Sequence, residues 1–235
     1  QDGRNYNLIF NNNNNGVQLA DFAATGGRDY TLTITTAGVS VGIDTTEVVE
    51  PEPLPTNDYV VYQANEKIFA TNNAFAAIDA RLNEISQLGV NVLWLMPIHP
   101  YGLEKTAHSP YCVRDFKGIK EEFGTMDDLK TLVNHAHERG MRVILDWIAN
   151  HAAFDNPWAI EHPEWFTGPV SRPEMWWGDV TFFDYDNNPA AREAMVDAMT
   201  YWMTEAGIDG FRCDYAEGLT DSVWTLLIND VRAVK

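Results

Sequence analysis

The sequence contains few basic residues, few cysteines and no long apolar run. Its 16 Lys and Arg stand against 34 Asp and Glu, which gives a formal net charge of −18 over 235 residues. This negative field repels nucleic acid and anionic membrane surfaces, so we expect neither as a partner. Because no stretch of 18 apolar residues occurs, we expect no transmembrane helix in this chain. The charge balance suits a soluble protein that binds a neutral ligand.

The usage of cysteine and glycine argues against a disulfide-rich protein and against a nucleotide-binding protein. Cys112 and Cys213 are the only cysteines, too few for a disulfide framework. We favour two buried free thiols over a bridge between them. No glycine-rich fingerprint follows any predicted strand, which disfavours nucleotide binding.

The first 52 residues differ in composition from the rest of the chain. The asparagine run 11–15 is typical of a solvated loop, whereas 30–35 and 39–43 are predicted strands. A complete β-sandwich needs more strands than this segment can hold. We therefore interpret residues 1–52 as the C-terminal part of an N-terminal β-sandwich domain, followed by a linker at residues 53–57.

From residue 58 onward, predicted strands and helices alternate. One predicted helix stops at Gly89, one is capped by Thr125, one begins at Pro189 and a last one is capped by Asp221. Four β-α units predict an α/β fold with a parallel sheet, and both a doubly wound sheet and a (β/α)₈ barrel fit. The predicted strands are residues 59–62, 92–96, 142–146 and 208–214.

Charged residues gather where the third and fourth predicted strands end. Arg212 and Asp214 are two residues apart, so their side chains point to the same face of a strand. An arginine beside a carboxylate keeps that carboxylate ionised, as a glycosidase nucleophile requires. A buried ion pair that only fixes the sheet is an equally good interpretation of these two residues alone.

These segments resemble the signatures of the alpha-amylase family of glycoside hydrolases. Asp146–His151 is similar to a signature of Asp, apolar residues and Asn-His, and Gly210–Asp214 to Gly-Phe-Arg-x-Asp. The resemblance covers residues 58–235. It implies the first four β-α units of a (β/α)₈ TIM barrel, with residues 152–188 as a short B domain after the third strand. Three upstream segments also resemble the family: 95–98, 109–111 with Asp115, and 123–125 with Asp128–Leu129.

The resemblance implies a role for each matching residue. Asp214 would be the catalytic nucleophile, and Arg212 would orient it and hold its charge. His151 would hydrogen-bond the sugar, and Tyr111 would stack on it. Structural roles remain alternatives for both His151 and Tyr111. Most aromatic residues of the B domain are expected to form a small core, with one or two that contact glycan.

Further residues belong to the same implied site. Asp146 would support the site, and Asp115 would belong to the substrate-binding set. Asn150 would ligate a structural Ca²⁺ ion through oxygen, although a turn-forming role is the alternative. The family often continues with Lys-His after the nucleophile. Here Glu217 takes the place of a cation, while Gly218 could still offer a backbone carbonyl to calcium.

One catalytic group is expected from outside the four predicted units. A retaining glycosidase needs a second carboxyl about 5 Å from the nucleophile. In this family that glutamate follows the fifth strand, and the β-α count of this chain stops at four. We therefore expect the remaining half of the barrel to come from further sequence. We expect residues 1–235 alone to be inactive.

The leading functional hypothesis is an enzyme that hydrolyses α-glucosidic bonds of starch-like polysaccharides or maltooligosaccharides with retention. A transglycosylating relative of the branching or glucanotransferase type is the second hypothesis, and a non-catalytic glycan-binding homologue is the third. The family resemblance also predicts a secreted or cell-surface protein whose signal segment is absent from this chain.

Overall fold

The computed structural model describes residues 5–12, 17–25, 30–35, 38–43, 58–167 and 178–233. The chain divides into two compact units, Gln1–Val49 and Glu50–Lys235. The predicted linker at 53–57 lies outside the described residues, so the domain boundaries inferred from the sequence stay a prediction.

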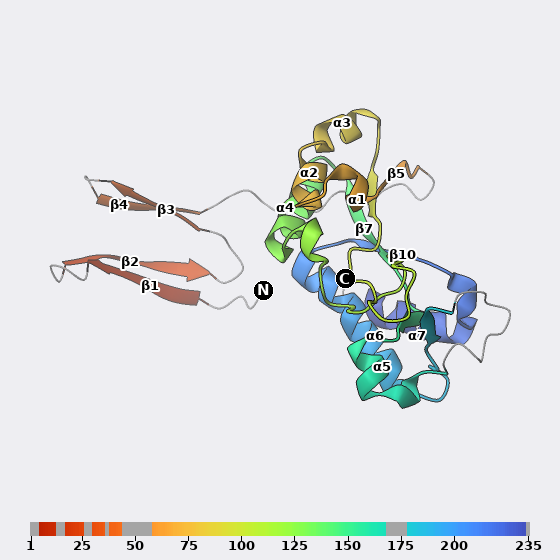
Figure 1. Cartoon of the computed structure of the whole chain (residues 1–235). Helices are drawn as coiled ribbons and strands as arrows, with labels where there is room; N and C mark the ends of the chain where they lie inside the picture. The colour runs from red at the N-terminus through yellow and green to blue at the C-terminus, as the bar shows by residue number, and fades with distance from the viewer. Residues whose placement is uncertain are drawn as a thin grey trace. The chain divides into compact units, whose positions relative to one another are not determined.

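The first unit contains two antiparallel hairpins (Figure 1). Strand β1 (Asn5–Asn12) pairs with β2 (Val17–Thr25), and β3 (Tyr30–Thr35) pairs with β4 (Gly38–Ile43). The second hairpin was predicted and the first was not. The predicted loop at 11–15 is wrong for Asn11 and Asn12, which pair with Gln18 and Val17 after a register shift. Their pairing with β2 overrides the low strand propensity of asparagine.

The second unit is built on a four-stranded parallel sheet in the order β10-β7-β6-β5. All four strands predicted from the sequence are present, which confirms the α/β interpretation. The central strands are largely buried and the two outer strands are less so. The strands are β5 (Val61–Ala64), β6 (Val92–Leu95), β7 (Arg142–Trp147) and β10 (Gly210–Cys213).

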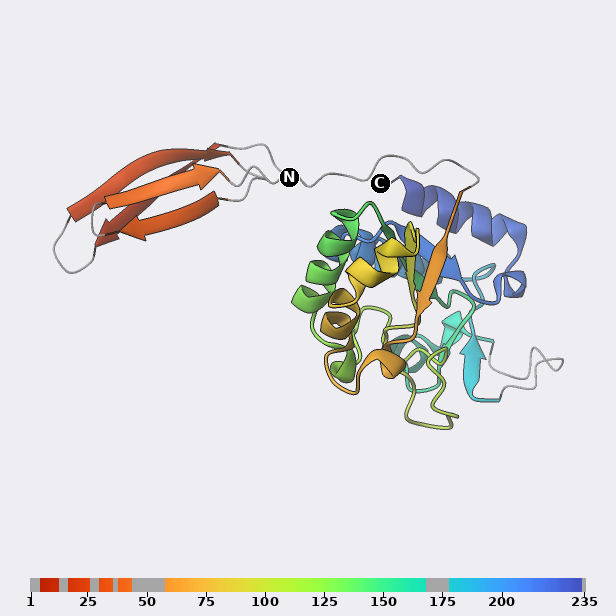
Figure 2. The same cartoon turned by 90° about the horizontal axis from the view of Figure 1, so that it is seen from above.

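Helices pack against this sheet, and Figure 2 shows α2, α3 and α4 gathered beside it. Thr125 caps α4 as predicted, in a capping box with Asp128, and Gly89 and Gly140 adopt the positive φ of helix ends. The helices are α1 (Glu66–Phe69), α2 (Ala74–Asp79), α3 (Leu82–Gln87), α4 (Met126–His137), α5 (Pro157–Glu161), α6 (Pro189–Tyr201) and α7 (Asp221–Arg232). Shorter turns are the 3₁₀ helices at Glu121–Phe123, Pro163–Trp165 and Ala216–Gly218, and the π-helical turn Trp202–Ala206.

Two helix predictions are corrected. The helix expected before Gly89 is interrupted at Ala80–Arg81 and forms both α2 and α3. The cap of α7 is Thr220, whose hydroxyl accepts the Val223 N–H at 3.4 Å, and Asp221 is the first helical residue. Thr220 takes this position because it has the extended backbone that an N-cap requires.

The segment after β7 contains a short antiparallel hairpin, and its assignment as a B domain over residues 152–188 stays a prediction. Strand β8 (His151–Ala153) pairs antiparallel with β9 (Val180–Phe182), with α5 between them in sequence. Trp158 stacks on Phe116 at a ring distance of 5.0 Å and lies edge-on to Trp165. These contacts support the prediction that the aromatic residues mainly form a core. Trp176 and Trp177 lie outside the described residues.

The cysteines are both free, Cys112 buried and Cys213 partly exposed, so the expectation of burial is wrong for Cys213. It lies on β10, at the edge of the described sheet. Across the described part of the chain, every helix is too short or too polar to cross a bilayer.

Candidate active site

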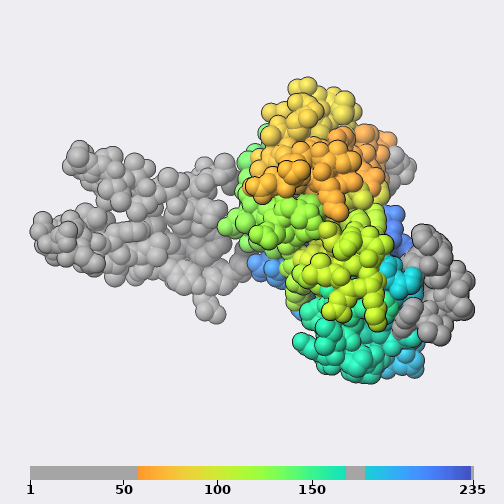
Figure 3. Space-filling view, in the orientation of Figure 1, coloured from red at the N-terminus to blue at the C-terminus, as the bar shows by residue number. Residues whose placement is uncertain are grey.

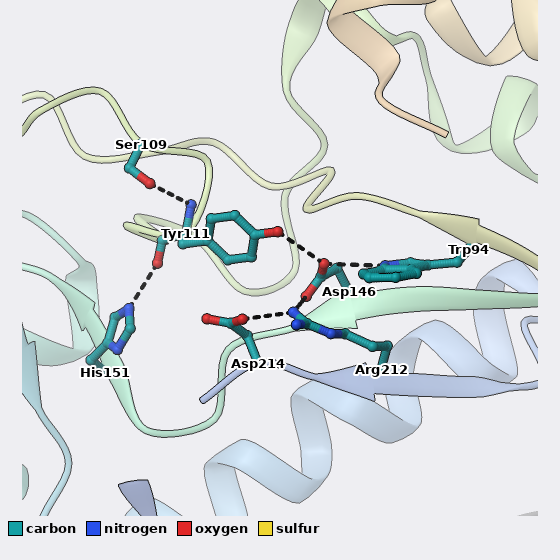
Figure 4. Close-up of polar contacts among 7 residues, drawn as sticks. All are labelled: Trp94, Ser109, Tyr111, Asp146, His151, Arg212 and Asp214. Carbon is teal, nitrogen blue, oxygen red and sulfur yellow. Dashed lines mark hydrogen bonds and ion pairs between the residues drawn. The ribbon is translucent and has the colours of Figure 1, made fainter. Parts of the chain in front are cut away.

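Arg212 and Asp214 come together at the carboxyl end of the sheet (Figure 4). The Arg212 Nη1 atom lies 2.7 Å from Asp214 Oδ1 and 3.0 Å from Asp146 Oδ1. Strands β10 and β7 run in register so that Arg212 lies opposite Asp146. One guanidinium therefore bridges two carboxylates. The predicted shared face of Arg212 and Asp214 is confirmed.

The two carboxylates differ in their access to solvent. Asp146 is completely buried, whereas the Asp214 side chain is 26% exposed. Asp146 also accepts hydrogen bonds from Trp94 Nε1 at 3.1 Å and from the Tyr111 hydroxyl at 3.2 Å. Burial raises the pKa of Asp146, and its bonds to Arg212 oppose this shift. Asp214 is thus the carboxylate that a substrate can reach.

Tyr111 and His151 form the other side of the site. His151 Nε2 lies 3.0 Å from the Tyr111 carbonyl, so this nitrogen carries the proton. Burial lowers the pKa of His151 to about 4, and its ring is therefore neutral at pH 7. Burial and the negative charge of Asp146 raise the pKa of Tyr111 to about 12. The Tyr111 hydroxyl consequently remains a hydrogen-bond donor.

Sequence reasoning missed the role of Trp94. The indole of this β6 residue donates to Asp146, and its ring lies 4.9 Å from the Arg212 guanidinium carbon, within cation–π range. Trp94 contacts both partners of the ion-pair network. An available signal was a tryptophan within an aliphatic strand, because a buried indole N–H usually finds a polar partner.

Glu66 was also missed. This first residue of α1 is only 1% exposed, and Oε1 has no hydrogen-bond partner among the described residues. Burial raises its pKa to about 8, with a smaller contribution from the negative charge of Asp146. Glu66 is therefore a neutral acid at pH 7. No local pattern predicts this burial, because a glutamate in a first helical turn is usually solvated.

Asp115 is placed apart from the site residues. It is exposed, and its carboxylate accepts the Lys117 N–H at 2.9 Å in a local turn. No contact joins it to Tyr111, His151 or Asp214 in the described structure. Its predicted role in substrate binding stays a prediction.

Asn150 is buried, and neither atom of its side-chain amide has a partner among the described residues. Gly218 lies against this amide, because a Cβ atom at Gly218 would be 2.7 Å from Asn150 Nδ2. Such an unpaired buried oxygen fits a hard cation as one ligand. The described residues contain no cluster of three acidic, histidine or cysteine side chains that would complete a metal site.

A cavity of about 720 Å³ opens beside this network. Tyr111, His151 and Asp214 line it together with Lys105 and Asp179. Its size is that of a typical small-ligand site. The structure therefore places three of the predicted site residues in one cavity.

Residues 70–176 match the family model described as the alpha amylase catalytic domain. The chain belongs to the alpha-amylase family. It is 31% identical to "Alpha-amylase MalA" of Haloarcula japonica over 188 residues, which cover 73% of this chain and 27% of that protein. It is 32% identical to "Trehalose synthase/amylase TreS" of Mycolicibacterium smegmatis, over 69% of this chain and 34% of that protein. The chain thus spans about a third of the length of these curated relatives.

The structural comparison agrees with this membership. The crystal structure of the maltogenic alpha-amylase AmyB from Thermotoga neapolitana superposes with a TM-score of 0.69 and 36% identity. The match covers 75% of this chain and 43% of that one. Structural neighbours in this family are (β/α)₈ barrels, and the parallel sheet described here corresponds to part of such a barrel.

Proposed function

We propose that this chain carries the nucleophile half of the active site of a retaining glycosidase that acts on α-glucosidic bonds of starch-like glucans. The observation that supports the proposal is the 2.7 Å ion pair between Arg212 and Asp214. It sits at the carboxyl end of the parallel sheet, where barrel enzymes place their catalytic groups. It also leaves Asp214 on the wall of a cavity.

In the proposed first step, an Asp214 oxygen attacks the anomeric carbon as the bond to the leaving oxygen breaks. This gives a covalent glycosyl-enzyme intermediate, which water then hydrolyses with overall retention. Arg212 fixes the attacking carboxylate and balances its charge. Tyr111 supports the sugar ring, and the neutral His151 hydrogen-bonds a hydroxyl group.

A second carboxyl must protonate the leaving oxygen, and Asp146 is unsuited to this. It is fully buried and accepts three hydrogen bonds, from Arg212, Trp94 and Tyr111. We propose that further β-α units pair with β5 and β10, complete the barrel and supply this acid. A chain that spans about a third of its relatives is consistent with this division of the site.

The test of the nucleophile is Asp214→Asn in the full-length protein. We expect kcat on maltooligosaccharides to fall by several orders of magnitude while the melting temperature changes little, because Asn keeps the shape but not the negative charge. Asp197→Asn, on an exposed face of α6, is the matched control. Proton NMR of the first product should show the α-anomer. A variant with near-normal hydrolysis, or a β-anomeric product, would refute the proposal.

We also propose that Asn150 Oδ1 ligates a structural Ca²⁺ ion, with backbone carbonyls near Gly218 among the remaining ligands. The support is the buried amide without a partner. A ligand that binds only the folded state stabilises it by mass action. Excess chelator should therefore lower the melting temperature of the wild type but not of Asn150→Ala. An unchanged wild-type melting curve would remove calcium from the proposal.

A transglycosylating activity is the second candidate, and the similarity to a trehalose synthase/amylase supports it. Products separate the two candidates. A hydrolase converts maltotriose only into shorter sugars, whereas a transglycosylase also forms longer or rearranged ones. A non-catalytic glycan-binding homologue would bind maltotriose without turning it over.

A further inference from the structure

The cavity contains two charged residues that the proposed catalytic steps do not use. Lys105 and Asp179 line it together with Tyr111, His151 and Asp214. Lys105 lies in the loop 102–112, here called the tongue, and Asp179 immediately precedes β9. Two separate segments therefore bring polar groups to the same cavity as the nucleophile.

The tongue is held in place at its base and along its length. Gly102 N donates to the Cys112 carbonyl at 2.8 Å, which closes the loop on itself. Figure 3 shows the tongue (yellow-green) beside the segment of β9 (cyan). Its bonds to the insertion are Leu103 N to Asp155 Oδ2 at 3.0 Å, Ala107 N to Asp179 Oδ2 at 3.3 Å and Cys112 Sγ to the Asp179 carbonyl at 3.1 Å.

These bonds fix Asp179 relative to the residues that would hold the sugar. Tyr111 belongs to the tongue, and its carbonyl accepts the His151 N–H at 3.0 Å. His151 pairs in turn with Phe182 across the hairpin that Asp179 precedes. The tongue is thus bonded to the hairpin segment at Asp179 and again at His151. Asp179 is therefore preorganised with respect to Tyr111 and His151.

The Asp179 carboxylate retains acceptor capacity. A carboxylate offers about four lone-pair sites on its two oxygens, and among the described residues only the Ala107 N–H occupies one, on Oδ2. Asp179 is partly exposed. Neighbouring hydroxyl groups of a sugar are donors that suit such an acceptor, and hydrogen bonds to a charged acceptor are the stronger kind. Lys105 adds a donor to the same wall.

We propose that Asp179, assisted by Lys105, binds the hydroxyl groups of a second sugar unit, adjacent to the unit held by Tyr111, His151 and Asp214. This inference rests on the proposed function and specifies its substrate. The site selects a neutral chain of at least two glucosyl units over a single glucosyl group.

The experiment compares two substrates in the full-length protein: maltotriose, and p-nitrophenyl α-glucoside, which has one sugar unit. Asp179→Ala should lower kcat/KM for maltotriose about ten- to a hundredfold, the effect of losing hydrogen bonds to a charged acceptor. It should leave kcat/KM for the aryl glucoside close to the wild-type value. The ratio of kcat/KM for maltotriose to kcat/KM for the aryl glucoside therefore falls in Asp179→Ala. Lys105→Met should lower this ratio by a smaller factor.

Asp155→Asn is the matched control, because Asp155 also anchors the tongue but does not line the cavity. It should leave the ratio of the two kcat/KM values unchanged. Asp179→Asn keeps an oxygen for the Ala107 N–H, so a ratio that falls in this variant too reports substrate binding rather than a displaced tongue. An unchanged ratio in Asp179→Ala would overturn the inference.

The two proposals fail in different ways. If wild type hydrolyses both substrates and Asp214→Asn hydrolyses neither, the proposed function stands whatever Asp179 does. If wild type hydrolyses neither substrate, the proposed function fails, and calorimetric titration with maltotriose and with glucose decides the inference. Equal maltotriose affinity in wild type and Asp179→Ala would then overturn it.

Discussion

Asp146 organises the site at the level of single side chains. It receives donors from three separate segments, namely Arg212 on β10, Trp94 on β6 and Tyr111 in the tongue. Arg212 is shared with Asp214, so one positive charge is divided between two negative ones. The resulting net negative charge favours the oxocarbenium-like transition state expected of a glycosidase.

Trp94→Phe should weaken this network without removing a proposed catalytic group. The variant loses the indole N–H that donates to Asp146, and a hydrogen bond to a charged group contributes about 1.5–3 kcal/mol. With one donor fewer, the pKa of Asp146 rises further. We therefore expect lower stability in urea titrations and a shift of the acidic limb of the kcat/KM profile to higher pH.

Trp202→Phe is the control for Trp94→Phe. Its buried indole donates to the Phe116 carbonyl at 2.7 Å, so this variant also loses one tryptophan hydrogen bond. It should be destabilised but keep the wild-type pH profile of kcat/KM. An identical profile in Trp94→Phe would show that Trp94 only contributes to packing.

Glu66 should make stability depend on pH. Its pKa is about 8 in the folded chain against an ordinary value of 4.5, so between these values the folded state binds more protons than the unfolded state. The contribution of Glu66 to the free energy of unfolding is fully present below about pH 4.5, where the acid is neutral in both states. As the pH rises towards 8, this contribution is lost, and the free energy of unfolding falls by at most about 1.4 kcal/mol per pH unit.

Glu66→Gln should remove that dependence, because Gln is neutral at every pH. We expect wild type to lose stability relative to this variant between about pH 5 and 8 in urea titrations, according to the linkage relation. Glu84→Gln, at a surface ion pair with Arg81, should follow the wild-type curve. Parallel curves for wild type and Glu66→Gln would contradict the raised pKa of this buried acid.

At the level of elements, the pattern of the sequence predicted the strands well and the helices partly. Buried strands such as β6 and β7 are short apolar runs that only a sheet interior accommodates. The break between α2 and α3 was invisible because the apolar spacing continues across Ala80–Arg81. Strand β1 was missed because its asparagines pair with β2, an interaction that local propensity does not encode.

The candidate site was predictable where it depends on residues close in sequence. Arg212 and Asp214 share a strand, so their juxtaposition follows from the two-residue period. Contacts between residues on different elements could be predicted only from the family resemblance, and some could not be predicted at all. Trp94 meets Asp146 across 52 residues of sequence, and Asp179 meets Ala107 across 72. No periodic pattern connects such pairs.

An ion-pair cluster at the start of β10 should stabilise the sheet. Asp209 accepts from His137 Nε2 at 2.8 Å, Val143 N at 2.8 Å and Arg142 Nη1 at 3.2 Å. The side chains of His137 and Asp209 are 8% and 6% exposed. The carboxylate thus joins α4, β7 and β10.

Asp209→Asn should lower the free energy of unfolding by about 3–5 kcal/mol, as expected when one partner of a buried ionic cluster is neutralised. Urea titration of the full-length protein provides the measurement. Asp197→Asn breaks an exposed ion pair, in which the side chain of Lys117 is 38% exposed and that of Asp197 is 71% exposed. It should lower the free energy of unfolding by less than about 1 kcal/mol. Similar losses in the two variants would mean that Asp209 does not join the elements.

At the scale of the whole molecule, the outer strands β5 and β10 of the described sheet each pair with a neighbour on one side only. Strand β5 and its flanking residues are exposed at Tyr59, Val60 and Val61. Beside β10, a groove of about 560 Å³ runs between α6 and α7 and is lined by apolar residues that include Phe211 and Trp224. Unpaired strand edges next to apolar surface invite pairing with further strands.

A polypeptide of residues 58–235 should therefore not hydrolyse maltotriose. Of the carboxyls near the nucleophile, Asp146 is buried and held by three donors, and Asp179 is assigned to sugar binding, so neither supplies the catalytic acid. It should also self-associate through β5, β10 and the groove of α6 and α7. Light scattering after size exclusion would measure the association, and a hydrolysis assay beside the full-length protein would measure activity. Ile228→Lys, which places a charge at an exposed position of the groove, should reduce association, whereas Asp197→Lys on exposed α6 should not. A monomer that hydrolyses maltotriose at a rate comparable to the full-length protein would show that these four strands already contain a complete catalytic site.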